Sequence, residues 1–152
     1  MIVELRPAVE ADIAVIASDP READVVEMRA LGYGFEEALH NSLARSDWAL
    51  TATVDGVPVC MMGVAPVSVI FGEGAPWLLS ANGVLKAQKS LLKTCGPVVG
   101  RMLATYPRLL NIVDSENAVS IRWLRWVGFE FLDQRFPIRG RTFRLFRLGD
   151  WS

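Results

Sequence analysis

Histidine and cysteine are scarce in this sequence of 152 residues, which has only His40, Cys60 and Cys95. They do not form the short spacings that metal ligands or redox cysteine pairs require. We therefore expect no metal site and no disulfide, and both cysteines should be small apolar side chains in a reducing compartment. His40 lies beside the apolar positions of a helical stretch, so we expect it to have a structural role.

The chain also lacks a long uninterrupted apolar run. The nearest candidate, residues 56–72, contains Pro58 and Pro66 and is shorter than the roughly 20 residues of a spanning helix. Residues 1–4 carry an acid where a secretory signal has basic residues. We expect no membrane span and no export, which indicates the cytoplasm of a cell or of an infected host.

Apolar side chains are abundant, since 51% of the residues are hydrophobic and 22% are charged. This length and composition suit one domain, residues 1–152, with one core. The net charge of −1 conceals an uneven distribution: residues 1–75 carry 12 acidic and 4 basic side chains, and residues 76–152 carry 5 acidic and 12 basic ones. We expect the opposite charges of the two halves to attract each other within the fold, and we do not expect nucleic acid as a partner. The alternative is an open basic surface that binds phosphates.

Periodicity and turn residues predict a mixture of strands and helices. The expected strands are residues 3–6, 48–54, 57–64, 77–81, 109–113, 129–133 and 142–148. The expected helices are residues 10–17, 19–31, 35–43, 84–106 and 117–127. Asp55-Gly56 and Arg139-Gly140 are the expected hairpin turns, residues 66–76 a loop, and Pro97 should kink the longest helix. Helical crossovers predict parallel pairing from 77–81 to 109–113 and on to 129–133.

The segment Asn117–Phe129 reads N-A-V-S-I-R-W-L-R-W-V-G-F, so a helix-capping residue opens it and Gly128 ends it. It resembles the signature of the GNAT acyl-CoA N-acyltransferases, in which Asn starts a helix, a small residue follows three positions later and Gly-Phe ends it. With Leu5-Arg6-Pro7 and the Asp55-Gly56 hairpin, the resemblance covers nearly the whole chain. It implies an α/β (mixed α+β) fold with a largely antiparallel sheet of six to seven strands flanked by helices. Helix capping alone also explains Asn117 and Gly128.

The resemblance further implies a site for acetyl-CoA, in which the backbone of a central strand holds the pantetheine arm. The corresponding residues here are Leu78, Leu79, Ser80 and Ala81, with Asn117 and Ser120 at the start of the later helix. A glycine-rich loop that binds the pyrophosphate should follow the strand, but residues 82–89 read N-G-V-L-K-A-Q-K, with one glycine. Lys86 and Lys89 either replace that loop or form the solvated face of a helix. We therefore expect acetyl-CoA binding to be weak or absent.

The residues available for proton transfer depart from the family as well. Many GNAT enzymes have a tyrosine seven residues after the Asn, where Leu124 stands here and has no proton to give. Glu73, Asp114 and Glu116 flank the expected cleft and are candidate bases for an amine. Their position in loops is more typical of solvated carboxylates than of catalytic bases.

Within the same segment, the stretch I-R-W-L-R resembles the internal virion protein family of short-tailed bacteriophages, which are small GNAT-like proteins. That resemblance implies contacts with other phage or host proteins during virion assembly or infection, virion association, and weakened or lost acyl transfer. The alternative is an acetyl-CoA-dependent N-acyltransferase that acts on an unidentified amine. The missing loop and Leu124 favour the first function, whereas Asn117 and the basic helix keep the second open.

Overall fold

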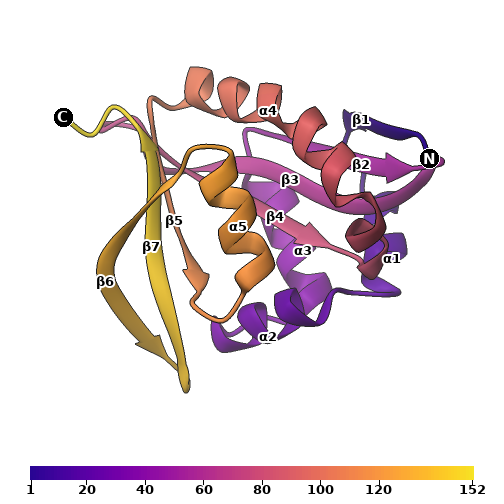
Figure 1. The fold of residues 1–152 in the computed structure, drawn as a ribbon, viewed down its shortest axis with the longest axis horizontal. Helices are drawn as coiled ribbons and strands as arrows, with labels where there is room; N and C mark the ends of the chain where they lie inside the picture. Colours follow the sequence, from indigo (N-terminus) through magenta and orange to yellow (C-terminus); the bar gives the residue numbers. More distant parts are fainter.

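A computed structural model describes all 152 residues and contains one seven-stranded sheet (Figure 1). The strands are β1 (Val3–Pro7), β2 (Trp48–Val54), β3 (Val57–Ser68), β4 (Glu73–Ser80), β5 (Arg108–Asp114), β6 (Glu130–Ile138) and β7 (Arg141–Gly149). The helices are α1 (Ala11–Ala17), α2 (Glu22–Ala30), α3 (Phe35–Arg45), α4 (Gln88–Thr105) and α5 (Ala118–Trp126), with a 3-10 turn η1 (Asn82–Ala87) before α4. The expected mixed, largely antiparallel sheet flanked by helices is confirmed.

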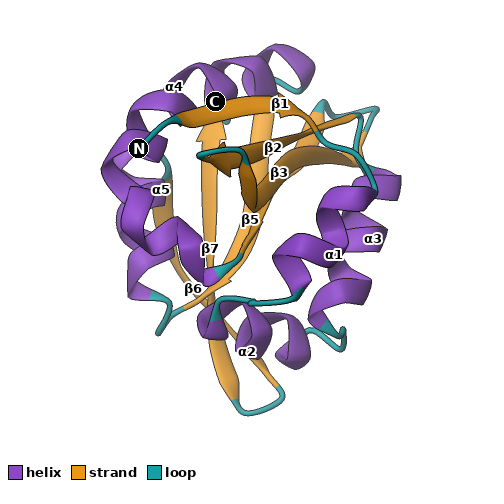
Figure 2. Cartoon of the chain, turned by 90° about the vertical axis from the view of Figure 1, so that its right-hand side faces the viewer, coloured by secondary structure: helices purple, strands orange, loops and turns teal.

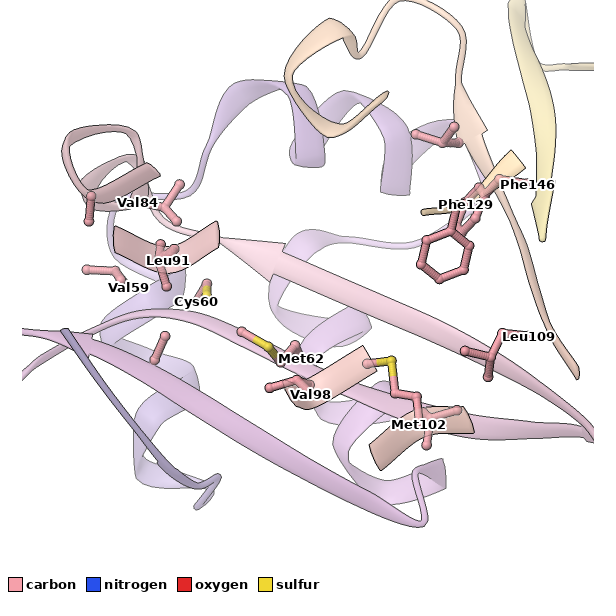
Figure 3. Close-up of a cluster of buried hydrophobic side chains, with 14 of the residues drawn as sticks. Val59, Cys60, Met62, Val84, Leu91, Val98, Met102, Leu109, Phe129 and Phe146 are labelled. Carbon is pink, nitrogen blue, oxygen red and sulfur yellow. The ribbon is translucent and has the colours of Figure 1, made fainter. Parts of the chain in front are cut away.

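The helices cover both faces of the sheet, with α4 and α5 on one face and α1 to α3 on the other (Figure 2). Successive side chains of a strand point to opposite faces, so β3 contributes Met62 to the core beneath α4 and Met61 to the core beneath α1 and α3. Figure 3 shows the larger core, in which Met62 lies close to Val98 and Met102 of α4. No helix has the length and apolar character required to cross a membrane.

Both hairpin turns are confirmed by their backbone angles. Asp55 and Gly56 have φ values of 50° and 84°, and Arg139 and Gly140 have 45° and 81°. Two consecutive positive φ angles define the tight turn whose twist matches that of the flanking strands. The two hairpins therefore form where the sequence alone places them.

The predicted loop over residues 66–76 is too long, because only residues 69–72 form a turn between β3 and β4. The hairpin of β3 and β4 continues into it, with Pro66 opposite Gly74 in the register. Pro76 fits inside β4 because its missing N–H lies on the side where β5 has already diverged, so no ladder bond is lost. The prediction of direct pairing between the fifth and sixth strands is also wrong, since β7 lies between β5 and β6 and pairs antiparallel with each.

The longest helix begins later than predicted, because η1 takes up the residues from Asn82 to Ala87. Pro97 lies within α4, which continues through it to Thr105. The expected compensation between the two halves of the chain is not seen as ion pairs, since every ion pair joins residues of the same half. Within the second half, Arg141 pairs with Asp114 and Glu116, and Arg147 pairs with Glu130.

Gly128 ends α5 with φ at 107°, as the sequence predicts. A Cβ at this position would meet only Leu148 Cδ1 at 3.8 Å, so space is not limiting and the backbone angle alone sets the cost. We expect Gly128→Val to lower the free energy of unfolding by about 1 kcal/mol or more. Urea unfolding measures this, and Gly128→Asn, which tolerates the angle better, should cost less. Equal stability of the valine variant and the parent would contradict this helix terminus.

Candidate active site

The sheet opens between its two central strands. β4 and β5 are parallel but pair only at Glu73–Arg108 and Gly74–Leu109, and beyond these pairs the strands separate. In the gap, Asn111 Nδ2 donates a hydrogen bond to Pro76 O at 2.8 Å. The opening forms a cleft of about 200 Å³. Most of the residues from β4, β5, α4 and α5 that line this cleft are apolar. The splayed strands thus create an apolar cleft in the middle of the sheet.

The backbone of β4 presents hydrogen-bonding groups to this cleft at one residue. Ala81 N–H donates to Val59 O of β3, so alternation directs Ala81, Leu79 and Trp77 toward β3 and directs Leu78 and Ser80 toward the gap. Ser80 is occupied there, because its N–H donates to Asp24 and its C=O accepts from Arg21 N–H. The N–H and C=O of Leu78 face the cleft with no strand opposite them. Of the four strand residues implied by the resemblance, only Leu78 therefore has backbone groups available to a ligand.

A buried ion pair lies at the start of α2, between its N-cap residue Arg21 and Asp24. Arg21 Nη2 lies 2.7 Å from Asp24 Oδ1, and the two side chains are only 8% and 2% exposed. Burial raises the pKa of Asp24, and the Arg21 charge opposes that rise. Because Asp24 also accepts the Ser80 N–H at 2.9 Å, the pair ties α2 to the end of β4.

The same arginine reaches the first turn of α5. Arg21 Nη2 donates to Ser120 Oγ at 2.9 Å, and Nη1 donates to Asn117 Oδ1 at 3.4 Å. Asn117 Oδ1 also caps the helix by accepting the Ser120 N–H. Asn117 Nδ2 and Ser80 Oγ, by contrast, are buried without a hydrogen-bond partner. Arg21 thus holds in place the two residues at the start of α5 that the resemblance implies as cofactor ligands. The side-chain N–H groups of Asn117 have no hydrogen-bond partner.

Glu27 is the acidic residue on the cleft wall, and the sequence analysis missed it. Its Oε1 accepts the backbone N–H of Asp114 at 2.7 Å, which fixes the carboxyl group at the end of β5. Burial raises its pKa to about 7, and the nearby Asp24 and Asp114 charges contribute to the rise. A desolvated carboxyl group with a pKa near neutrality is suited to accept a proton from a bound ligand.

The three predicted bases lie elsewhere. Asp114 is not a solvated loop residue, since it is buried at the end of β5 and bonded to Arg141 Nε at 2.6 Å. Glu116 is exposed and also pairs with Arg141. Glu73 begins β4 at the closed end of the gap. None of the three lines the cleft. Asp114 is placed beside it, where it positions Glu27.

Lys86 and Lys89 are exposed, in η1 and in the first turn of α4. Two backbone amides of the turn are occupied, because Asn82 N–H donates to Asp19 O at 2.9 Å and Val84 N–H donates to Ala81 O at 3.2 Å. Leu124 lines the cleft with its apolar side chain. No group of three or more potential metal ligands is present.

The two cysteines and the single histidine differ in their exposure. Cys60 is buried and Cys95 partly buried, and neither forms a disulfide. Cys95 lines the cleft, but burial raises its pKa to about 11, so it is a neutral thiol at physiological pH. His40 is exposed, with Nδ1 3.5 Å from Glu10, and is not part of the apolar face beside which the sequence placed it.

Solved structures with a similar architecture include several N-acetyltransferases. A ribosomal-protein-alanine N-acetyltransferase from Brucella melitensis superposes with a TM-score of 0.70 at 14% identity, covering 96% of this chain and 99% of that one. An aminoglycoside acetyltransferase in complex with coenzyme A gives 0.69 at 16% identity, covering 97% and 95%. A spermidine N-acetyltransferase from Vibrio cholerae gives 0.67 at 12% identity, covering 97% and 93%.

No family model matches the sequence, and no curated protein matches it either. The structural similarity covers nearly the whole chain at identities that show the fold alone. The chain therefore has the fold of the GNAT N-acetyltransferases, as the sequence predicts.

Proposed function

We propose that this protein is an acyl-CoA-dependent N-acyltransferase. The observation that carries the proposal is the position of Glu27, a desolvated carboxyl group on the wall of an apolar cleft that also exposes the backbone of Leu78. An acyl-transfer site for amines needs these two elements, a base for the ammonium proton and donors for the acyl group.

The cleft suits the pantetheine arm of acyl-CoA better than its phosphates. Apolar walls and the free Leu78 N–H and C=O match an arm that carries amide groups on an aliphatic chain. When bound, acyl-CoA supplies an acyl group already activated as a thioester. Its pyrophosphate would meet Lys86 and Lys89 rather than a glycine-rich loop.

The protein's own residues then have separate tasks. Glu27 Oε1 is held by the Asp114 N–H, so the carboxyl group keeps one orientation and can take a proton from an ammonium group through Oε2. The Arg21–Asp24 pair fixes α2 against β4, which holds Glu27 at the cleft. The apolar lining, Leu124 included, excludes water that would compete with the amine.

Weak phosphate recognition has a measurable consequence. Exposed ion pairs contribute little, so changing Lys86 and Lys89 together to alanine should weaken acetyl-CoA binding by only about fivefold. Calorimetry at low and raised salt measures the change, and Arg29→Ala on α2 is the control that should leave binding unaltered. A loss of about a hundredfold would show that the phosphates, and not the arm, dominate binding.

The proposal is tested by incubating the purified chain with acetyl-CoA and a panel of primary amines. We expect free CoA thiol to accumulate together with the N-acetylated amine, identified by mass spectrometry. Thiol release without an acetylated amine would indicate hydrolysis and contradict the proposal. The protein-contact role in phage assembly stays a prediction, because the similarities reported above are to acetyltransferases.

A further inference from the structure

A second hollow continues from the cleft toward the opposite face of the sheet. It lies between α2, α3 and the β3–β4 hairpin. The two hollows share Met28, Leu31, Ser42, Trp77 and Asn111 as lining residues. A molecule in this groove, which we call the acceptor groove, would therefore reach the cleft from the side opposite α4 and α5.

One charged residue, Arg45, lines the acceptor groove. It is the last residue of α3, is exposed, and takes part in no ion pair or side-chain hydrogen bond. The other lining groups are apolar, apart from the hydroxyls and amides of Tyr33, Asn41, Ser42 and Asn111. Glu27 lines the cleft but not the groove. A molecule that extends from the cleft into the acceptor groove would therefore meet the carboxylate of Glu27 in the cleft and the guanidinium group of Arg45 in the groove.

We propose that the acceptor is a primary amine joined through an apolar segment to an anionic group such as a carboxylate. This inference rests on the proposed acyltransferase function and names its substrate class. The amine would lie at the cleft beside Glu27, the apolar segment along the groove, and the anion against Arg45. A polyamine or another polycation would place a second positive charge against Arg45, with no carboxylate in the groove to receive it.

Arg45 also has a simpler role, because a basic residue in the last turn of a helix interacts favourably with the helix dipole. That role affects only stability, so it predicts no preference between ligands. The test must therefore compare two ligands of equal length and different end charge in the full chain.

The ligands are ω-aminooctanoate and octamethylenediamine, with apparent Kd values measured by protein-observed NMR titration. We expect the wild type to bind ω-aminooctanoate about threefold or more tightly than the diamine, the size of one partly solvated ion pair. Arg45→Glu should reverse the preference. Arg29→Glu, in the last turn of α2 and outside the groove, should keep it.

Equal or tighter binding of the diamine by the wild type, or an unchanged preference in Arg45→Glu, would overturn the inference. Acetyl transfer is measured in parallel with both amines. A retained preference in binding together with no transfer from acetyl-CoA would contradict the proposed acyltransferase function and still support the assignment of the groove. Transfer to the diamine at a higher kcat/KM than to ω-aminooctanoate would contradict the substrate class alone.

Discussion

Glu27→Gln should lower kcat/KM for acetyl transfer by about 10²- to 10⁴-fold, the usual contribution of a positioned general base. Glutamine keeps an oxygen that can accept the Asp114 N–H, so the fold should persist. Steady-state kinetics with acetyl-CoA and the best amine of the panel measure the loss. Glu22→Gln, an exposed change in the first turn of the same helix, is the control and should retain activity. Full activity in Glu27→Gln would exclude this residue as the base.

The pH dependence of kcat/KM should also show that Glu27 is the base. Glu27 acts as a base only when ionised, so wild-type kcat/KM should rise through a pH of about 7 and this rise should vanish in Glu27→Gln. Stability should change in the opposite direction. The folded state holds this proton more tightly than the unfolded state, whose pKa is 4.5, so stability falls as pH rises from 4.5 to about 7. Above that range the glutamine variant should be at least as stable as the wild type.

Arg21→Ala should lower the free energy of unfolding by about 3–5 kcal/mol, because it leaves the Asp24 carboxylate buried without its partner. The substitution also removes the donors to Asn117 and Ser120, so α2 loses its link to α5. Urea unfolding at neutral pH measures the effect. A loss below about 1 kcal/mol would contradict the burial and pairing of Asp24.

Two variants separate the charge from the contact. Arg21→Ala combined with Asp24→Asn should recover part of the loss, because the asparagine oxygen can still accept the Ser80 N–H and no buried charge remains. Arg147→Ala removes an arginine whose partner Glu130 is 59% exposed, and it should cost less than about 1 kcal/mol. A large effect at Arg147 would show that any arginine of this chain is costly to remove.

The features predicted correctly from the sequence are those that local chemistry determines. The sequence predicts positive φ angles at Asp55-Gly56, Arg139-Gly140 and Gly128, and the structure has them at these positions. The insertion of β7 between β5 and β6 has no local signal, because the last hairpin could have joined the sheet on either side of β6. Strand order at this edge depends on packing between distant segments.

The buried charged residues of the candidate site also depend on packing between distant segments. Leu78 could be placed at the cleft through the resemblance, but Arg21, Asp24 and Glu27 could not, because charged residues on a helix are usually solvated. Their burial depends on contacts with Ser80 and Asp114, which lie 56 and 87 residues from their partners Asp24 and Glu27. The spacing of three that places Arg21, Asp24 and Glu27 on one face of α2 was the available signal.

The most direct test of the acyl-CoA site is amide hydrogen exchange at Leu78, followed by NMR with and without acetyl-CoA. The Leu78 N–H faces the cleft without a strand partner, so we expect it to exchange rapidly in the free protein and to become protected at saturating acetyl-CoA. Ala81, whose N–H is bonded to Val59, is the internal control and should be protected in both states. Unchanged exchange at Leu78 in the presence of acetyl-CoA would contradict binding of the arm in this cleft.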